Sequence, residues 1–197
     1  MAYIGKQPAP AALTSSDITD GIISVAKLTS TLDLSSNTVT LPSGVGGKVL
    51  QVVETRKTDT ASTSSSTFSA ISGLSASITP SSSSNKILVS FTICGSGGNH
   101  HHAAISRDSG SSFVGAGVAV GSRPATNAYF NTDANEARSN TAIILDSPSS
   151  TSELTYQVYW RSNSSTVYLN RTQNDVDAGY SARSASSVTL MEIAGWL

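Results

Sequence analysis

The chain has 197 residues, which is long enough for one domain with an additional segment. It contains 38 serines and 21 threonines, and only 13% of its residues are charged, which is an unusual composition for an enzyme. The 12 basic and 13 acidic side chains nearly cancel and no apolar run approaches the roughly 20 residues of a membrane span, so we expect neither nucleic-acid binding nor membrane insertion. The single cysteine, Cys94, excludes an intrachain disulfide and a cysteine-based zinc site, and the lack of a signal-peptide pattern in residues 1–6 predicts a protein made in the cytoplasm.

Residues 1–47 combine a candidate helix with an extended polar stretch. The helix is predicted to begin at residues 15–17 (SSD), whose side chains can cap free backbone N–H groups. Its apolar positions recur with approximately helical spacing: Ile18, Ile22, Ile23, Val25, Ala26 and Leu28. Residues 32–34 and 38–41 then alternate apolar and polar side chains as strands do, and the glycine-rich residues 42–47 close the segment. Because so short a helix needs a partner surface, we expect this segment to bind another protein, to pair with copies of itself or to stay flexible.

From Lys48 onward, short alternating segments are separated by clusters of turn-forming residues. The predicted strands are residues 48–54, 67–71, 74–78, 86–94, 103–107, 112–120, 141–145, 154–161, 166–170 and 187–193. Residues 86–94 alternate most regularly, and their apolar positions fall on one face: Ile87, Val89, Phe91 and Ile93. Recurring turn signals without a long helical pattern predict an all-β head domain over residues 48–197, an antiparallel β-sandwich of jelly-roll type.

Large side chains after residue 128 fall into two sets. Tyr156, Val158 and Trp160 share one strand face, so we expect them in the core. The second set lies in loop-like stretches, where exposed aromatic side chains are frequent in saccharide-binding sites: Tyr129, Phe130 and Tyr180.

The sequence contains no motif that identifies a catalytic centre. A Gly-x-Ser-x-Gly elbow is missing, and residues 44–49 are a glycine-rich linker rather than a phosphate-binding loop. Two carboxylate pairs could serve a glycosidase, although solvated acidic loops are the favoured interpretation: Asp133 with Glu136, and Asp175 with Asp177. We therefore predict a protein that is not an enzyme, with no catalytic, cofactor-binding or metal-binding residue.

Three adjacent histidines, residues 100–102, are the most distinctive local feature. Strand alternation would place His100 and His102 on one face and His101 on the other. In a symmetric trimer, one imidazole from each chain could meet its equivalents at the axis and bind a metal ion. The favoured alternative is an exposed loop or strand edge after the glycine-rich turn at residues 95–98, and in that case His100 and His102 are dispensable for folding.

Several short stretches occur in an order that resembles a known family. Residues 1–8 (MAYIGKQP) and 13–22 (LTSSDITDGI) are similar to the start of tail-fibre-like proteins of marine bacteriophages, including those of cyanobacteria. Residues 32–42 (LDLSSNTVTLP) resemble the lead-in that these proteins place before a globular tip. Similar stretches follow through the tip: residues 48–53, 57–60, 78–81, 86–89, 146–148, 167–171 and 189–195. The likeness therefore spans nearly the whole chain.

The resemblance implies a non-enzymatic structural protein of the virion. It implies attachment to other phage tail or capsid proteins through residues 1–47, and display of a trimeric β-head that helps bind a glycan or protein of the host surface. No long shaft repeat precedes residue 48, which favours a short tail fibre or similar appendage on the particle surface, assembled in the host cytoplasm. A purely architectural decoration protein of the capsid or tail is the alternative, and a polysaccharide hydrolase is less favoured. Ligand binding would involve the loops at residues 95–102, 121–139 and 172–183.

Overall fold

The computed structural model describes residues 48–195, and the helix and strands predicted within residues 1–47 lie outside them. The chain divides between Gly46 and Gly47 into two units, and the described residues all belong to the second. Within residues 48–195 every pairing of strands is antiparallel and no α-helix forms, which confirms the predicted all-β head.

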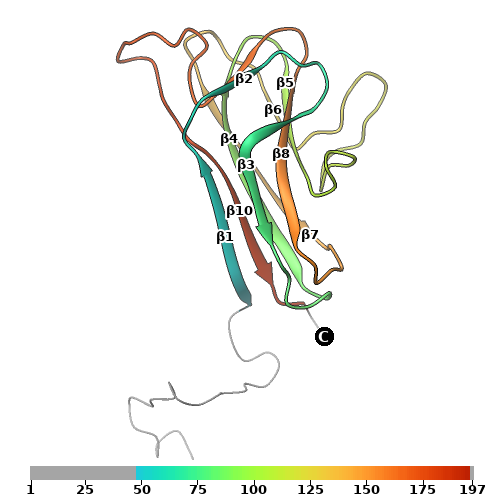
Figure 1. Ribbon diagram of the computed structural model, residues 1–197. Helices are drawn as coiled ribbons and strands as arrows, with labels where there is room; N and C mark the ends of the chain where they lie inside the picture. Colours follow the sequence, from blue (N-terminus) through green and yellow to red (C-terminus); the bar gives the residue numbers. More distant parts are fainter. Residues whose placement is uncertain (1–47, 196–197) are drawn as a thin grey trace, which may run out of the picture. The chain divides into compact units, whose positions relative to one another are not determined.

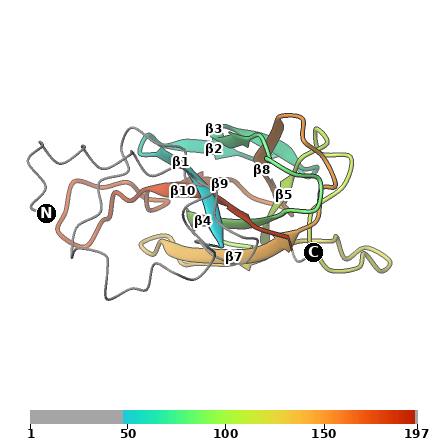
Figure 2. The same ribbon diagram turned by 90° about the horizontal axis from the view of Figure 1, so that it is seen from below.

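The ten strands of the described residues form two sheets that pack face to face (Figures 1 and 2). The six-stranded sheet has the order β1 (Val49–Lys57), β10 (Ser186–Ile193), β4 (Lys86–Ser96), β9 (Val167–Leu169) and β2 (Ala61–Thr63), with β7 (Arg138–Asp146) beside β4. The four-stranded sheet has the order β3 (Ser69–Ile78), β8 (Leu154–Ser162), β5 (His101–Ser106) and β6 (Ala128–Phe130). Apart from the short β2 and β9, the orders β1-β10-β4-β7 and β3-β8-β5-β6 are those of a double Greek key, which confirms the predicted jelly-roll sandwich.

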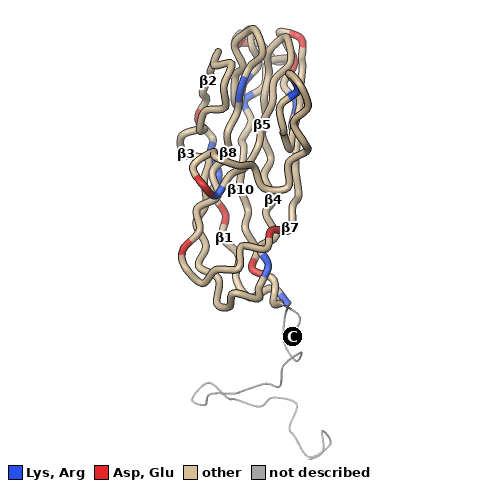
Figure 3. The backbone as a smooth tube through the Cα atoms, turned by 90° about the vertical axis from the view of Figure 1, so that its right-hand side faces the viewer, with Lys and Arg blue, Asp and Glu red and all other residues tan. Residues whose placement is uncertain are grey.

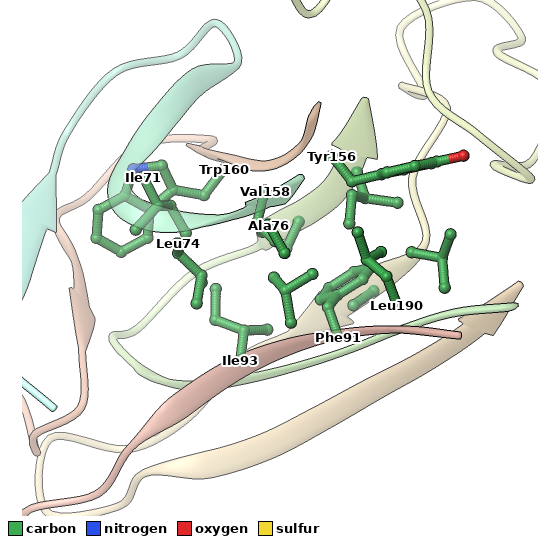
Figure 4. Close-up of a cluster of buried hydrophobic side chains, with 14 of the residues drawn as sticks. Ile71, Leu74, Ala76, Phe91, Ile93, Tyr156, Val158, Trp160 and Leu190 are labelled. Atoms are coloured by element: carbon green, nitrogen blue, oxygen red, sulfur yellow. The ribbon is translucent and has the colours of Figure 1, made fainter. Parts of the chain in front are cut away.

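The core lies between the two sheets and is built from inward side chains at alternating positions (Figure 4). The side chains predicted for it are buried on both sheets: Ile87, Val89, Phe91 and Ile93 on β4, and Tyr156, Val158 and Trp160 on β8. Full burial of one such side chain stabilises a fold by about 1.5–3 kcal/mol relative to exposure. The period-two alternation of the chain therefore accounts for most of this core.

Two predicted strands are joined in the structure. Residues 67–71 and 74–78 contribute to one strand, β3, whose register with β8 shifts between Ala70 and Ser75. Gly73 lies at this irregularity with a φ of +75°, a conformation that glycine adopts without the steric strain of a side chain. A glycine between two apolar runs occurs both at a bulge within one strand and at a turn between two strands. The sequence alone therefore could not show that Ser69–Ile78 form one strand.

The strand predicted at residues 112–120 is wrong, because this stretch belongs to the long loop between β5 and β6. Its apolar residues anchor the loop instead of alternating in a sheet. The Phe113 ring contacts those of Phe68 and Tyr159, with centroids 4.4 and 6.0 Å apart. Val114 packs against the core. Spaced anchors of this kind resemble strand alternation when only the sequence is considered.

The short strands β2 and β6 were not predicted. Each has three residues, too few for alternation to be recognised. Tyr129 and Phe130, which were expected in a loop, lie in β6. Phe130 points into the core, whereas Tyr129 is 49% exposed on the outer face.

The two ends of the sandwich carry different parts of the chain (Figure 1). Val49, the first residue of β1, pairs with Ile193 at the end of β10, so the described residues begin and end near one another. The connections from β4 to β5, from β6 to β7 and from β9 to β10 lie at the opposite end. Charged residues are sparse and scattered along the backbone of the sandwich (Figure 3). None of residues 48–195 belongs to a helix long and apolar enough to cross a membrane.

Candidate functional site

The sequence marks residues 95–102, 121–139 and 172–183 for ligand binding, and the loops within them that connect β4 to β5, β6 to β7 and β9 to β10 meet at the end of the sandwich opposite to the start of β1 (Figure 1). Residues 121–127 belong instead to the loop between β5 and β6. The backbone N–H of Thr132 donates to the carbonyl of Gly97 at 3.1 Å, which joins the first two loops. The backbone N–H of Asn174 donates to the carbonyl of Ala134 at 3.0 Å, which joins the second and third. The three loops therefore form one surface.

Both predicted carboxylate pairs border hollows in this loop surface. Asp133 and Glu136 line a hollow of about 100 Å³, and Asp175 and Asp177 line a separate one of about 310 Å³. In each pair one carboxylate already forms an ion pair with arginine: Glu136 with Arg138 at 3.1 Å, and Asp175 with Arg183 at 2.7 Å and with Arg171 at 3.4 Å. Exposed ion pairs of this kind contribute at most about 1 kcal/mol each. Their visible effect is to hold the carboxylates in place within their own loops.

The position of His101 differs from the expected one, which was an exposed loop or strand edge. β5 begins at this residue, and its side chain is wholly buried beside Phe130, with ring centroids 5.5 Å apart. Neither ring nitrogen has a hydrogen-bond partner among the described residues. Burial lowers the pKa of His101, and the backbone of Gly97 and Gly98 offsets only part of this effect. The expectation of an exposed loop or strand edge is wrong for His101 and His102, because β5 lies inside the four-stranded sheet and both residues pair with β6 on one side and β8 on the other.

The alternation predicted for the histidines is confirmed, since His100 and His102 both lie beside the exposed Tyr129. His102 pairs with Tyr129 of β6 on one side and with Arg161 of β8 on the other. The rings of His102 and Tyr129 are 5.5 Å apart, and His100 Nδ1 lies 2.5 Å from the Tyr129 hydroxyl oxygen. Burial, and then the charge of Arg161, lower the pKa of His102. We call His100, His102, Tyr129 and Arg161 the Arg161 cluster.

A metal site is not assembled by one copy of the described chain. Within residues 48–195 no group of three or more His, Cys, Asp or Glu side chains could hold a metal ion. His101 points into the core, so only His100 and His102 could meet imidazoles from other copies. The metal site at a trimer axis stays a hypothesis.

Two other residues of interest lie near the loop surface. Tyr180, the third predicted aromatic candidate, is 67% exposed.

Asn170 begins a glycosylation sequon but is fully buried, and its amide donates to the carbonyls of Lys57 and Asp59, at 2.9 Å each. Its side-chain oxygen accepts from Ser186 Oγ at 2.7 Å. Asn170 therefore links the ends of β1, β9 and β10, which is a structural role.

The outer face of the six-stranded sheet carries an apolar row that the sequence did not reveal. Val52 of β1 pairs with Met191 of β10, and Met191 pairs in turn with Leu88 of β4. Leu88 pairs with Leu145 of β7, so the row crosses four strands. Val52 and Leu145 are 57% and 58% exposed. Three neighbouring aliphatic side chains extend the row, and we call the whole set the outer apolar face: Val49, Ile143 and Ile193.

Both surfaces left a partial signal in the sequence. Leu88 is apolar although β4 places the polar Lys86 and Ser90 at the neighbouring outward positions, and β7 places two apolar side chains outward, Ile143 and Leu145. Arg161 faces outward because Trp160 beside it faces the core. The sequence could have marked Leu88, Leu145 and Arg161 as outward, but not which residues pair with them.

No family model and no curated protein matches the chain. Among solved structures, the chain is similar to the crystal structure of the infectious bursal disease virus VP2 subviral particle, with 10% identity and a TM-score of 0.33. The match covers 86% of this chain and 47% of the other, so this chain spans about half the length of that protein. A likeness at this level says nothing about function.

Proposed function

We propose that the protein is a structural protein of a bacteriophage virion, a short tail fibre or similar appendage whose head assembles as a homotrimer and helps bind the host surface. The observation that carries this proposal is the outer apolar face. Aliphatic side chains in register across four strands form a continuous patch, and such a patch is unfavourable in water and favourable to bury.

A second copy of the chain is the partner that we propose for this face. In a closed three-fold ring the row from Val52 to Leu145 of each copy packs against a neighbouring copy, and only the side chains that lie on the axis meet their own equivalents. The row itself carries no charge, and two residues of opposite charge, Glu54 and Lys86, lie at its border. Hydroxyl groups flank it and can form hydrogen bonds between copies without the burial of an ion: Ser90, Thr92, Thr141 and Thr189.

The positions of the chain ends support a role in display. Residues 1–47 precede β1, and Val49 lies at the end of the sandwich opposite to the loop surface. If residues 1–47 bind a tail or capsid protein, as we propose, the head presents its three loops away from the point of attachment.

The sequence and the fold class agree with this function. The order of short motifs resembles that of tail-fibre-like proteins of marine bacteriophages, from residue 1 to residue 195. Jelly rolls are common in viral capsid and lectin domains, although a fold alone does not determine function.

Light scattering on the purified full-length protein tests the proposal. We expect a mass of three times the 20.3 kDa chain. Leu145→Lys places a charge in the outer apolar face and should yield folded monomers. Val118→Lys adds the same charge at a residue that is 88% exposed in the loop between β5 and β6, and should leave the trimer intact. A monomeric wild type, or a trimeric Leu145→Lys variant, would contradict the proposal.

An adsorption assay separates host attachment from a purely architectural role. Excess purified protein should slow the adsorption of phage particles to host cells, because it occupies the same surface molecules. A trimer that leaves the adsorption rate unchanged would favour an architectural protein.

A further inference from the structure

The Arg161 cluster lies on the outer face of the four-stranded sheet, on the other side of the molecule from the outer apolar face. Arg161, His102 and Tyr129 form a row across β8, β5 and β6, because His102 pairs with both of its neighbours. Residues directly opposite one another in antiparallel strands have Cβ atoms about 5 Å apart. One small molecule can therefore contact all three side chains, in a monomer and in the proposed trimer.

Arg161 differs from the other arginines of the described chain. Four of them form ion pairs with a carboxylate: Arg107, Arg138, Arg171 and Arg183. Two more are exposed to water: Arg56 and Arg123. Arg161 is half-buried and forms no ion pair within residues 48–195, and its Nε is buried without a hydrogen-bond partner there. The buried Nε is out of reach of a ligand, so an external acceptor would bind the terminal Nη atoms of this guanidinium, which form no ion pair within residues 48–195.

The charges around the row favour an anion. The groups that act on His102 are Arg161 on β8, His100 before β5 and His101 on β5, and each is a base that can only add positive charge. Because His102 Nδ1 is buried without a partner among the described residues, Nε2 is the ring nitrogen that a ligand could reach. On the β6 side of His102, the paired residue is Tyr129, whose polar group is a hydroxyl. Among the described groups that act on His102 there is no carboxylate, so an acceptor group at this position meets donors.

Tyr129 supplies a flat apolar surface beside these donors. Its ring is 49% exposed, and its hydroxyl group forms a hydrogen bond with His100 Nδ1. The two rings are stacked, with an angle of 23° between their planes. His100 thus lies against one side of the Tyr129 ring, and the exposed part of the ring can pack against the apolar face of a sugar ring.

We propose that the Arg161 cluster binds a sugar that carries a carboxylate group. The carboxylate accepts hydrogen bonds from the guanidinium of Arg161 and from the imidazole of His102. Guanidinium and carboxylate have matching planar geometry, which allows two parallel hydrogen bonds. The sugar ring packs on Tyr129. The proposal names the ligand class of the host-attachment function above and rests on that function only for its biological role.

Saturation-transfer NMR with the full-length protein tests the proposal, with trigalacturonate as the acidic probe and the corresponding neutral galactose trisaccharide as its match. We expect millimolar binding of trigalacturonate and at least about tenfold weaker binding of the neutral sugar. Arg161→Gln should weaken trigalacturonate binding about tenfold. Tyr129→Leu should weaken it about fivefold, whereas Tyr129→Phe keeps the ring and should retain binding within about twofold.

Arg56→Gln is the matched control, because it removes the same charge from the other sheet and should leave the affinity unchanged. Equal binding of the neutral and acidic sugars, wild-type affinity in Arg161→Gln, or equal losses in Arg161→Gln and Arg56→Gln would overturn the proposal. Acetate is the control for the carboxylate alone. If acetate displaces the probe as strongly as trigalacturonate does at the same carboxylate concentration, the proposed role of the sugar ring is wrong. The mass of the protein is measured in the same samples, so a failure of sugar binding is distinguished from a failure of the proposed trimer.

Discussion

Glu192 on β10 accepts a hydrogen bond of 2.5 Å from the side-chain amide of Asn85, although the Glu192 side chain is only 1% exposed. Ser81 donates to the same oxygen through its backbone N–H and its hydroxyl group, at 2.6 and 2.7 Å. Gln51 on β1 donates to the second oxygen at 2.6 Å. Burial raises the pKa of Glu192, but these hydrogen bonds outweigh it and hold the pKa below its ordinary value of 4.5. The carboxylate thus joins β1, β10 and the turn before β4.

Glu192→Gln should lower the free energy of unfolding by about 3 kcal/mol, because an amide nitrogen would face donors that now bind a carboxylate oxygen. Urea unfolding at pH 7 measures the effect. Glu153→Gln, at an exposed turn position, is the control and should change stability by less than about 0.5 kcal/mol.

The pH dependence of this effect has a defined sign. The folded protein binds the Glu192 proton more weakly than the unfolded chain, so the stabilisation is complete above pH 4.5 and is lost as the pH falls through the lowered folded value. The gap between wild type and Glu192→Gln should therefore narrow below pH 4.5. A gap that is constant between pH 7 and pH 3 would contradict the role of the ionised carboxylate.

His101 should make the head less stable in mildly acidic solution. Its pKa in the folded protein lies below the ordinary value of 6.5, so the unfolded chain binds the proton more readily. Stability should fall as the pH is lowered through 6.5. His101→Leu removes the buried imidazole, and its thermal melting temperature should change less between pH 7.5 and pH 5.5 than that of the wild type. Parallel melting curves for the two proteins would show that His101 is not responsible.

Chelation should leave the melting temperature of the wild type unchanged. His100 and His102 are outward side chains, and no cluster within residues 48–195 could hold a metal ion in one copy. The variant with both residues replaced by Ala should fold with a similar melting temperature. If EDTA lowers melting in the wild type but not in the double variant, a metal ion between copies is present and the prediction is wrong.

Removal of residues 1–47 should leave a folded head that no longer joins the particle. The core of the sandwich is made by strands that begin at Val49, so its packing does not require the preceding residues. Circular dichroism of the truncated protein should show β-structure with a cooperative melt. Particles assembled with truncated protein in place of wild type should lack it, and incorporation at normal copy number would show that attachment lies elsewhere.

Local alternation in the sequence was sufficient to identify the core and the fold class. Ile87 to Ile93 on β4 and Tyr156 to Trp160 on β8 follow the period of two that places side chains on one face of a strand. The same reasoning placed His101 opposite to His100 and His102, which the structure confirms. It failed for the loop at residues 112–120, where Phe113 and Val114 serve as anchors.

The sequence by itself determined which side chains face the core, because alternation is a property of neighbouring residues. Only the tertiary structure decided which outward residues meet, because strand pairing joins residues far apart in the chain. Leu88 meets Leu145 and Met191, and His102 meets Arg161, only through the register of these strands. A shift of one residue in register would turn these side chains to the opposite face. The apolar face and the cluster proposed to bind acidic sugars therefore exist only once the jelly roll has formed.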